Sequence, residues 1–229
     1  MITHLAMVMD GNRRWAKQRS MQPWLGHRQG VQVIKDVINF CLEKNIKHLS
    51  LYTFSVENFK RDPQELSYLF ETLVEESENH LDFLFEKEVK VKFIGDRSLF
   101  PENVLQKSIK IEQSTQDLSK LQVNLLFCYG GQQEILAGVK KIVSQVKQGL
   151  LDENDLSEKK FQENLWTYGI PEPDLIIRTG GMHRLSNFLL FQAAYSELYF
   201  LDCLWPDINL EHLNNAYKHF ENTKRNFGI

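Results

Sequence analysis

The residues best suited to chemistry near the N-terminus follow a short apolar run over 5–9. Asp10 and Gly11 form a strong turn dipeptide, and Arg13 and Arg14 come next in a segment of good helical propensity. A helix that starts after a strand presents free N–H groups to an anion. Guanidinium groups match phosphate oxygens, and a neighbouring carboxylate suits a hard divalent cation. These residues indicate a Mg²⁺-assisted diphosphate site. An ordinary turn with a solvated arginine pair is the alternative, and these residues alone favour it slightly.

A second group of residues, late in the chain, has the same chemistry. Gly180 and Gly181 let the backbone approach a ligand closely. Arg178, Arg184 and Ser186 can surround one phosphate group. The alternative is a loop whose arginines pair with surface carboxylates, but the glycine pair and the hydroxyl favour an anion site.

Other polar residues have both a functional and a structural interpretation. Glu197 is either a second oxygen ligand for a cation near Asp10 or a salt-bridge partner, and the sequence favours neither. His27 suits a phosphate contact, although a helix cap explains it better when it is taken alone. Glu57 and Asn58 suit substrate orientation, although a local Asx-type turn explains them more simply.

The composition limits the classes of function. The chain has 229 residues, 42% hydrophobic and 25% charged, which is typical of a soluble globular protein. A net charge of −3 argues against a broad nucleic-acid-binding face, so nucleic acid is not an expected partner. The three cysteines are widely spaced, as free thiols are, and no apolar run approaches the roughly 18 residues of a spanning helix. We therefore expect a cytoplasmic protein with at most peripheral membrane contact. P-loop, Rossmann, zinc-protease and nucleophile-elbow motifs do not occur in the sequence.

Strand-like and helix-like segments alternate along the chain. The predicted strands cover 5–9, 46–54, 89–95, 121–129, 174–178 and 198–201. Helical segments lie between them, including a long helix that Asp62 caps, with Glu65 in its first turn and apolar residues as far as Leu84. This alternation predicts an α/β fold: a single domain over 1–229, with a mostly parallel sheet of about six strands covered by helices on both faces. The polar groups follow predicted strands, so the carboxyl edge of the sheet is expected to bring them together.

The same segments resemble the cis-prenyltransferases, most closely the bacterial undecaprenyl diphosphate synthases. The motifs run in one order through nearly the whole chain: MDGNRRWA at 9–16, Gly26-His27, LYTFSVENF at 51–59, YGG at 129–131, DLIIRTGG at 174–181, HRLSNFLL at 183–190 and ELYFLDCLWPD at 197–207. The resemblance implies a homodimeric α/β fold with a hydrophobic tunnel. It also implies Mg²⁺ and repeated condensation of isopentenyl diphosphate onto an allylic diphosphate such as farnesyl diphosphate. The product would be a long-chain polyprenyl diphosphate of the undecaprenyl type, used for the cell-wall lipid carrier.

The resemblance also assigns roles by position. Asp10 is the catalytic carboxylate and a Mg²⁺ contact. Asn58 carries the family's proton-acceptor role, although an amide is a poor base and more simply orients a proton path ending on Asp10 or on the released diphosphate. His183 and Glu197 match the other metal positions, with His183 the weaker ligand because magnesium prefers oxygen. The expected substrate contacts are Gly11, Asn12, Arg13, Arg14, Trp15, His27, Ser55, Val56, Glu57, Phe59, Arg61, Arg178, Arg184, Leu185 and Ser186.

Five positions depart from the bacterial pattern and put substrate affinity and rate in question. They are Pro23, Cys128, Gln132, Met182 and Asn226. Two other functions stand as alternatives: a non-catalytic, prenyltransferase-like subunit that binds diphosphates or a partner, and an enzyme with a shorter cis-prenyl product. Because Asp10 and Asn58 are retained, the sequence favours an active enzyme. The length of the tunnel would decide the product.

Overall fold

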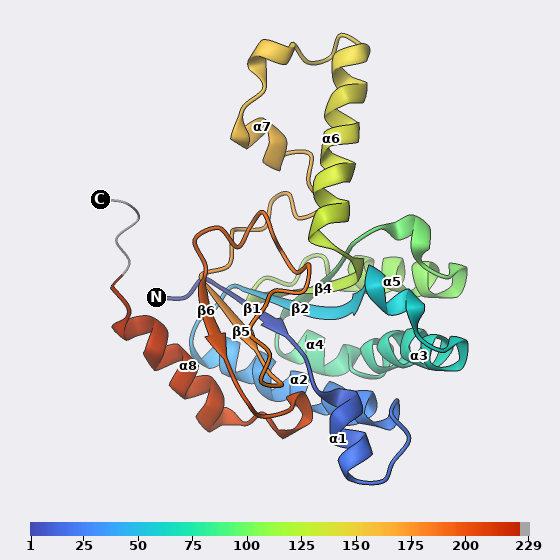
Figure 1. Cartoon of the computed structure of the whole chain (residues 1–229), viewed down its shortest axis with the longest axis vertical. Coiled ribbons are helices and arrows are strands. Elements are labelled where there is room, and N and C mark those ends of the chain that lie inside the picture. The colour runs from blue at the N-terminus through green and yellow to red at the C-terminus, as the bar shows by residue number, and fades with distance from the viewer. Residues whose placement is uncertain (225–229) are drawn as a thin grey trace.

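The computed structural model of the protein describes residues 1–224, and at positions 73, 74 and 77 the backbone only (Figure 1). At its centre is a six-stranded sheet in the order β3-β4-β2-β1-β5-β6, in which every neighbouring pair is parallel. The strands are β1 His4–Val8, β2 His48–Ser55, β3 Val89–Ile94, β4 Leu121–Tyr129, β5 Leu175–Arg178 and β6 Glu197–Phe200. The six predicted strands and their parallel arrangement are therefore confirmed.

Helices connect the strands, as the alternating pattern predicted. The α-helices are α1 Asn12–Gln18, α2 Leu25–Glu43, α3 Pro63–Asn79, α4 Leu81–Glu86, α5 Glu102–Thr115, α6 Gly131–Lys147, α7 Glu158–Gln162 and α8 Leu210–Asn222. Short 3₁₀ helices are η1 Val56–Lys60, η2 Arg97–Leu99, η3 Glu153–Asp155 and η4 Trp205–Asp207. The predicted cap of α3 is present, because Asp62 accepts a hydrogen bond from the Gln64 N–H at 2.8 Å. Within the described residues, none of the helices has the length and apolar character needed to span a bilayer.

Alternate side chains of each strand pack on opposite faces of the sheet, because successive strand residues point to opposite sides. Leu5 and Met7 of β1 join the larger core, to which α2, α3, α4, α5 and α8 contribute. Ala6 and Val8 point to the other face, where a smaller core includes Phe188. Helices cover the first face more fully, and loop residues supply much of the cover of the second.

The long helix expected after Asp62 is interrupted. α3 ends at Asn79 and α4 begins at Leu81, because His80 between them has a φ of −109° and a ψ of 12°, outside the helical region. Leu81 and Leu84 still pack against the larger core. The apolar pattern therefore continues through the break and conceals it in the sequence.

Two compensating bulges shape the carboxyl ends of β2 and β4. Thr53 and Cys128 have no partner in the ladder between these strands, and the register resumes with Ser55 opposite Tyr129. Cys128 has a φ of +49°, a conformation that residues other than Gly, Asn and Asp rarely adopt. Because each strand carries one extra residue, Ser55 and Tyr129 leave the sheet side by side.

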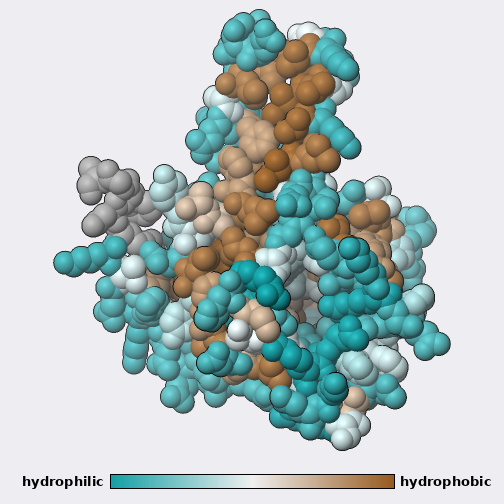
Figure 2. Space-filling view, viewed as in Figure 1, coloured by the Kyte–Doolittle hydropathy of each residue, from teal (hydrophilic) through white to brown (hydrophobic). Residues whose placement is uncertain are grey.

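α6 and α7 project from the sheet as an arm at the top of Figure 1. One side of α6 packs against the chain before β5, since a Cβ on Gly138 would lie 3.2 Å from Leu165 Cδ2. On its exposed side, Leu136, Val139 and Val143 recur at helical spacing and are 53%, 43% and 46% exposed. Figure 2 shows the apolar surface that runs along this arm.

Candidate active site

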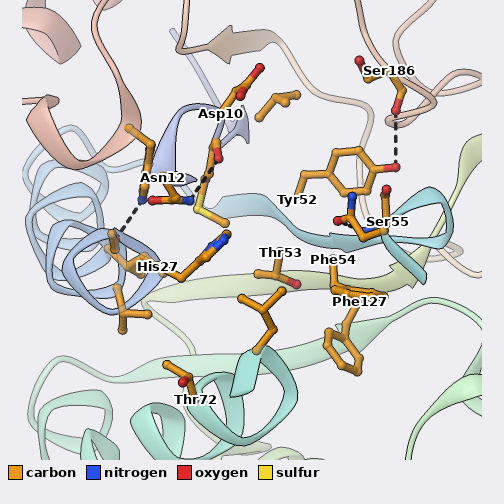
Figure 3. Close-up of a pocket in the computed structure, with 18 of the residues that line it drawn as sticks. Asp10, Asn12, His27, Tyr52, Thr53, Phe54, Ser55, Thr72, Phe127 and Ser186 are labelled. Atoms are coloured by element: carbon orange, nitrogen blue, oxygen red, sulfur yellow. Dashed lines mark hydrogen bonds between the residues drawn. The ribbon is translucent and has the colours of Figure 1, made fainter. Parts of the chain in front are cut away.

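The carboxyl ends of β1, β2 and β5 meet at a cavity of about 270 Å³ (Figure 3). Val8 at the end of β1 is in register with Tyr52 of β2 and with Arg178 of β5, so the segments that follow these strands begin side by side. The polar side chains that line this cavity include Asp10, Asn12, His27, Ser55, Asn58, Arg61, Arg178 and Ser186. The predicted convergence of distant segments at one edge of the sheet is therefore confirmed.

Asp10 lies between two guanidinium groups. Its Oδ1 is 3.2 Å from Nη2 of Arg14, and its Oδ2 accepts a 2.9 Å hydrogen bond from Nη2 of Arg178. The main-chain oxygen of Asp10 accepts hydrogen bonds from Thr179 Oγ1 at 2.7 Å and from the Trp205 N–H at 3.0 Å. These contacts fix the carboxylate, and with 31% of its side chain exposed it remains open to a ligand.

Arg178 is buried, with 5% of its side chain exposed, and it organises the loop after β5. Its Nη1 donates to Ser186 Oγ at 2.8 Å and to the main-chain oxygen of Arg184. The Nε of Arg184 also donates to Ser186 Oγ, at 3.3 Å. A buried guanidinium at the cavity acts in a low dielectric, where its attraction for an anion is stronger than in water.

A second cavity of about 250 Å³ adjoins the first and shares Asp10 with it. Guanidinium groups from Arg13, Arg14 and Arg61 line this second cavity together with His27. Burial, with the charges of Arg61 and Arg13, lowers the pKa of His27 from 6.5 to about 3, so the ring is neutral at neutral pH. Its Nε2 is buried with no hydrogen-bond partner among the described residues. The arrangement suits the oxygens of a diphosphate.

The cap interpretation of His27 is wrong. α2 begins at Leu25, its N-cap Trp24 makes no side-chain hydrogen bond, and His27 lies inside the helix. The close packing of α1 on α2 depends on the preceding residue, Gly26, because a Cβ there would lie 2.0 Å from the Asn12 main-chain oxygen. This contact brings the ring of His27 next to the turn that carries Asp10.

Glu65 supports the second cavity, a role that sequence reasoning missed. It is 3% exposed. Its Oε1 lies 3.1 Å from Nη1 of Arg61, and its Oε2 lies 3.6 Å from Nη1 of Arg13. A carboxylate between two guanidinium groups offsets their mutual repulsion and holds them at the cavity. In the sequence, a glutamate in the first turn of a helix is an ordinary helix-start residue. No sequence signal therefore indicated that Glu65 also holds two arginines at the cavity.

Asn58 has a structural role in the turn after β2, but it does not form the expected Asx-type turn. Its Oδ1 accepts a hydrogen bond from the N–H of the N-cap residue Ser55 at 3.1 Å, as one half of a capping box that starts η1. Both residues also line the first cavity, and the amide hydrogens of Asn58 are its means of contacting a ligand there. Glu57 binds elsewhere, because its Oε1 accepts a 2.7 Å hydrogen bond from Asn187 Nδ2.

Several expected substrate contacts border the two charged cavities without lining them. They are Trp15, Val56, Glu57, Phe59, Arg184 and Leu185. The Nε1 of Trp15 donates to Asp207 Oδ1 at 2.7 Å. Phe59 packs against Phe54, with ring centroids 5.1 Å apart. Leu185 packs against the smaller core.

The expected metal ligands do not come together within one chain. Glu197 begins β6 and is in register with Leu175 at the amino end of β5, whereas Asp10 follows the carboxyl end of β1. The ring of His183 packs against Phe200, with centroids 4.8 Å apart. In the part of the chain that the structure describes, no three His, Cys, Asp or Glu side chains form a group that could hold a metal. The predicted ligand set is therefore wrong for a single chain, because a parallel strand places its first residue at the far edge of the sheet.

Asp10 alone still suits a magnesium ion that arrives with a diphosphate. Mg²⁺ is usually held by one or two carboxylates together with substrate phosphates and water. The partly exposed Asp10 carboxylate lies where the two charged cavities join. The donor set present therefore fits Mg²⁺ when a diphosphate supplies the other oxygens.

An apolar cavity of about 70 Å³ continues the first cavity into the larger core. Val31 and Ile34 of α2 line both cavities. The other apolar residues of its wall are Ile38, Phe83, Leu84, Val91, Val123 and Leu125, and Glu76 and His80 add a polar pair. α2, α3 and β2 line these two cavities, and β3 and β4 add Val91, Val123 and Leu125 to the wall of the apolar one.

Four of the five departures from the bacterial pattern lie in the described part of the chain. Pro23 precedes α2, Cys128 forms the bulge of β4, Gln132 lies in the first turn of α6, and Met182 is 36% exposed on the loop after β5. None of these four side chains lines either charged cavity. Asn226 lies outside the described residues.

Comparisons with known proteins give the family to which the chain is similar. A family model described as "Putative undecaprenyl diphosphate synthase" matches residues 8–228. An isoprenyl transferase of Clostridium perfringens is 42% identical over 225 residues, which cover 98% of this chain and 89% of that protein. A ditrans,polycis-undecaprenyl-diphosphate synthase ((2E,6E)-farnesyl-diphosphate specific) of Buchnera aphidicola is 39% identical, covering 99% of this chain and 91% of that one. The crystal structure of lavandulyl diphosphate synthase from Lavandula x intermedia, in complex with dimethylallyl diphosphate, has a TM-score of 0.96 at 31% identity and covers 100% of this chain and 98% of its own.

Proposed function

The chain belongs to the undecaprenyl diphosphate synthase family of prenyltransferases, and we propose that it adds isopentenyl units repeatedly to an allylic diphosphate with the help of Mg²⁺. One observation carries this proposal. The Asp10 carboxylate is held between Arg14 and Arg178 where two charged cavities meet and an apolar cavity continues inward. Such a site accommodates two anionic head groups and one apolar tail.

The two substrates take different sides of Asp10. Arg13, Arg14 and His27 bind the allylic diphosphate, and the loop that Arg178 holds binds isopentenyl diphosphate. Holding both reactants in line replaces a bimolecular encounter. As the new C–C bond forms, the allylic C–O bond breaks and negative charge grows on the leaving diphosphate, which the guanidinium groups stabilise. Asp10, together with diphosphate oxygens, would hold a Mg²⁺ ion, which would supply further stabilisation of this charge.

The proton that the isopentenyl unit loses requires an acceptor. Asn58 is a poor base, and its Oδ1 already accepts the Ser55 N–H. Asn58 therefore orients the substrate, and the proton passes to Asp10 or to the released diphosphate.

Farnesyl diphosphate is the primer that we propose, with undecaprenyl diphosphate for the cell-wall lipid carrier as the product. The Buchnera relative is named as specific for farnesyl diphosphate, which supports this choice. A shorter cis-prenyl product is the second candidate. It is favoured by the small volume of the apolar cavity, about 70 Å³, and by the similarity to lavandulyl diphosphate synthase.

The test supplies farnesyl diphosphate, labelled isopentenyl diphosphate and Mg²⁺, and then sizes the products. Elongation that stops at about eleven isoprene units supports the first proposal, and a defined shorter product supports the second. Binding of both diphosphates without turnover would favour the non-catalytic subunit. A parallel reaction with a chelator in place of Mg²⁺ tests the cofactor.

We also propose that two chains associate through the arm formed by α6 and α7. Its exposed apolar side chains, among them Leu136 and Leu150, would be covered in a dimer. A cytoplasmic location is proposed from the free thiols Cys41, Cys128 and Cys203. Contact with membranes would then be peripheral and would arise through the lipid product.

A further inference from the structure

Two segments that are distant in the sequence, the start of α6 and the turn after β2, converge on Asn187, which lines neither charged cavity. The Gly131 N–H donates to its main-chain oxygen at 2.7 Å, and the Gln132 N–H donates to its Oδ1 at 2.8 Å. Its Nδ2 donates to Glu57 Oε1 at 2.7 Å and to Gln133 Oε1 at 2.9 Å. The side chain thus uses its acceptor and both of its amide hydrogens.

Two of these bonds cap α6 from outside the helix. The first N–H groups of a helix have no partner within it. The N-cap residue of α6 is Gly130, which makes no side-chain hydrogen bond. Asn187 supplies the missing acceptors, although it lies 55 residues after Gln132. A Cβ on Gly130 would lie 2.6 Å from Asn187 Nδ2, so a larger residue there would have to displace this amide.

The loop that carries Asn187 has an unfavourable backbone. Ser186, Asn187 and Leu189 have φ values of +52°, +66° and +44°. Left-handed conformations are costly for residues other than glycine, and least so for asparagine. Such a loop keeps its shape only while its contacts hold it. Arg178 holds the loop at Ser186. At the next position, the side chain of Asn187 holds the loop to α6 and to the turn after β2.

We propose that Asn187 is a positioning residue for the isopentenyl diphosphate site, an inference that rests on the proposed function. It holds the segment of Arg184 and Ser186 against the turn of Glu57 and Asn58, which borders the reaction cavity. Without this link, the two sides of the isopentenyl site are free to separate. The allylic side depends less on Asn187, because Glu65 holds its guanidinium groups independently.

The substitution Asn187→Asp tests the link to Glu57. Aspartate keeps the acceptor for the Gln132 N–H and tolerates a positive φ, but it places a carboxylate oxygen beside Glu57 Oε1. We expect the KM for isopentenyl diphosphate to rise about tenfold or more, from the lost hydrogen bond and the like-charge contact. The KM for the allylic diphosphate should change by less than about twofold. An equal rise in both KM values would overturn the proposal.

A double variant provides the matched control. Combined with Asn187→Asp, Glu57→Gln restores a donor opposite the new carboxylate. The KM for isopentenyl diphosphate should then return to within about threefold of the Glu57→Gln variant. A general loss of stability would not be repaired in this way, so failure of the rescue would also overturn the proposal. Should Asn187→Asp not fold, Glu57→Gln alone weakens the same bond and should raise the same KM by about threefold.

Hydrogen exchange separates this role from the proposed function. Elongation by the wild-type protein is measured first, in the kinetic assay used for the KM values. If the wild type does not elongate, that result counts against the prenyltransferase proposal alone, and the exchange experiment still tests Asn187. Asn187→Gly keeps the main-chain acceptor and tolerates the backbone, but it removes the acceptor for the Gln132 N–H. We expect that amide to exchange at least about tenfold faster in Asn187→Gly than in Asn187→Asp. Equal exchange rates would show that Asn187 does not hold the loop to α6.

Discussion

The carboxylate of Asp10 has opposite effects on binding and on turnover. It is needed for the reaction, but it also occupies guanidinium groups of Arg14 and Arg178 that would otherwise attract a diphosphate. We expect Asp10→Ala to lower kcat by at least about 10²-fold, as the loss of one group that acts on the transition-state charge commonly does. Without Mg²⁺, inorganic diphosphate should bind at least as tightly as to the wild type, because Arg14 and Arg178 are then free of the carboxylate.

Steady-state kinetics and calorimetry with inorganic diphosphate measure these two effects. Asp10→Asn is the control, because it keeps the size of the side chain and loses only the charge. Both variants should unfold at the wild-type temperature within a few degrees. Full turnover in Asp10→Ala would remove Asp10 from the reaction.

Single residues were predictable where their chemistry is visible in one segment. The Asp10 turn and the Arg178 loop carry charge and glycine, so the sequence pointed to both. Glu65 and Asn187 act through contacts with segments far along the chain, and no local pattern marks such contacts. Glu197 was assigned to the metal by the resemblance alone, although its place just before a predicted parallel strand already puts it at the amino edge of the sheet, away from Asp10.

At the scale of elements, the conformation of Cys128 in the bulge of β4 leads to a prediction about stability. Its φ of +49° is better tolerated by asparagine than by cysteine, and the main-chain oxygen of Leu99, 3.8 Å from its Sγ, can accept from an amide. We expect Cys128→Asn to raise the free energy of unfolding by roughly 0.5–1 kcal/mol. Cys128→Val should lower it, because a β-branched side chain opposes a positive φ. Urea unfolding measures the free energy of unfolding of each variant. If the two substitutions changed it by the same amount, the backbone conformation of Cys128 would not decide its stability.

The strands were predictable because each is a short apolar run between turn residues. The break at His80 and the paired bulges at Thr53 and Cys128 were not. The apolar spacing of Leu81 and Leu84 continues the pattern of α3, so the helix looked unbroken. A bulge adds one residue to a strand without changing its composition, and therefore leaves no signal in a single sequence.

The whole molecule should lose stability in mild acid. Burial lowers the pKa of His4 from 6.5 to about 4, and His27 behaves similarly at about 3. Between pH 6.5 and 4 the unfolded histidine binds a proton and the folded one does not, so stability is full above pH 6.5 and falls as the pH drops. His4 alone accounts for about 3 kcal/mol at 1.36 kcal/mol per unit. Urea midpoints measured from pH 8 to pH 4 test this, and a constant midpoint would contradict it.

Association through the arm is the second prediction for the whole molecule. Val143→Glu places a charge on the exposed apolar side of α6 and should convert dimers to monomers in sedimentation experiments. Ser144→Glu adds the same charge about 100° further round the helix and should leave the dimer intact. Equal effects of the two variants would show that the apolar side of α6 is not the interface.

The unequal exposure of the arginines determines how strongly the binding of each substrate depends on ionic strength. Arg13 and Arg14 have 52% and 44% of their side chains exposed, whereas Arg178 has 5%. Dissolved ions screen exposed charges far more than buried ones. Raising the salt concentration should therefore loosen the allylic substrate well before the isopentenyl one. Two ligands with the same diphosphate head group become distinguishable by the ions in the medium alone.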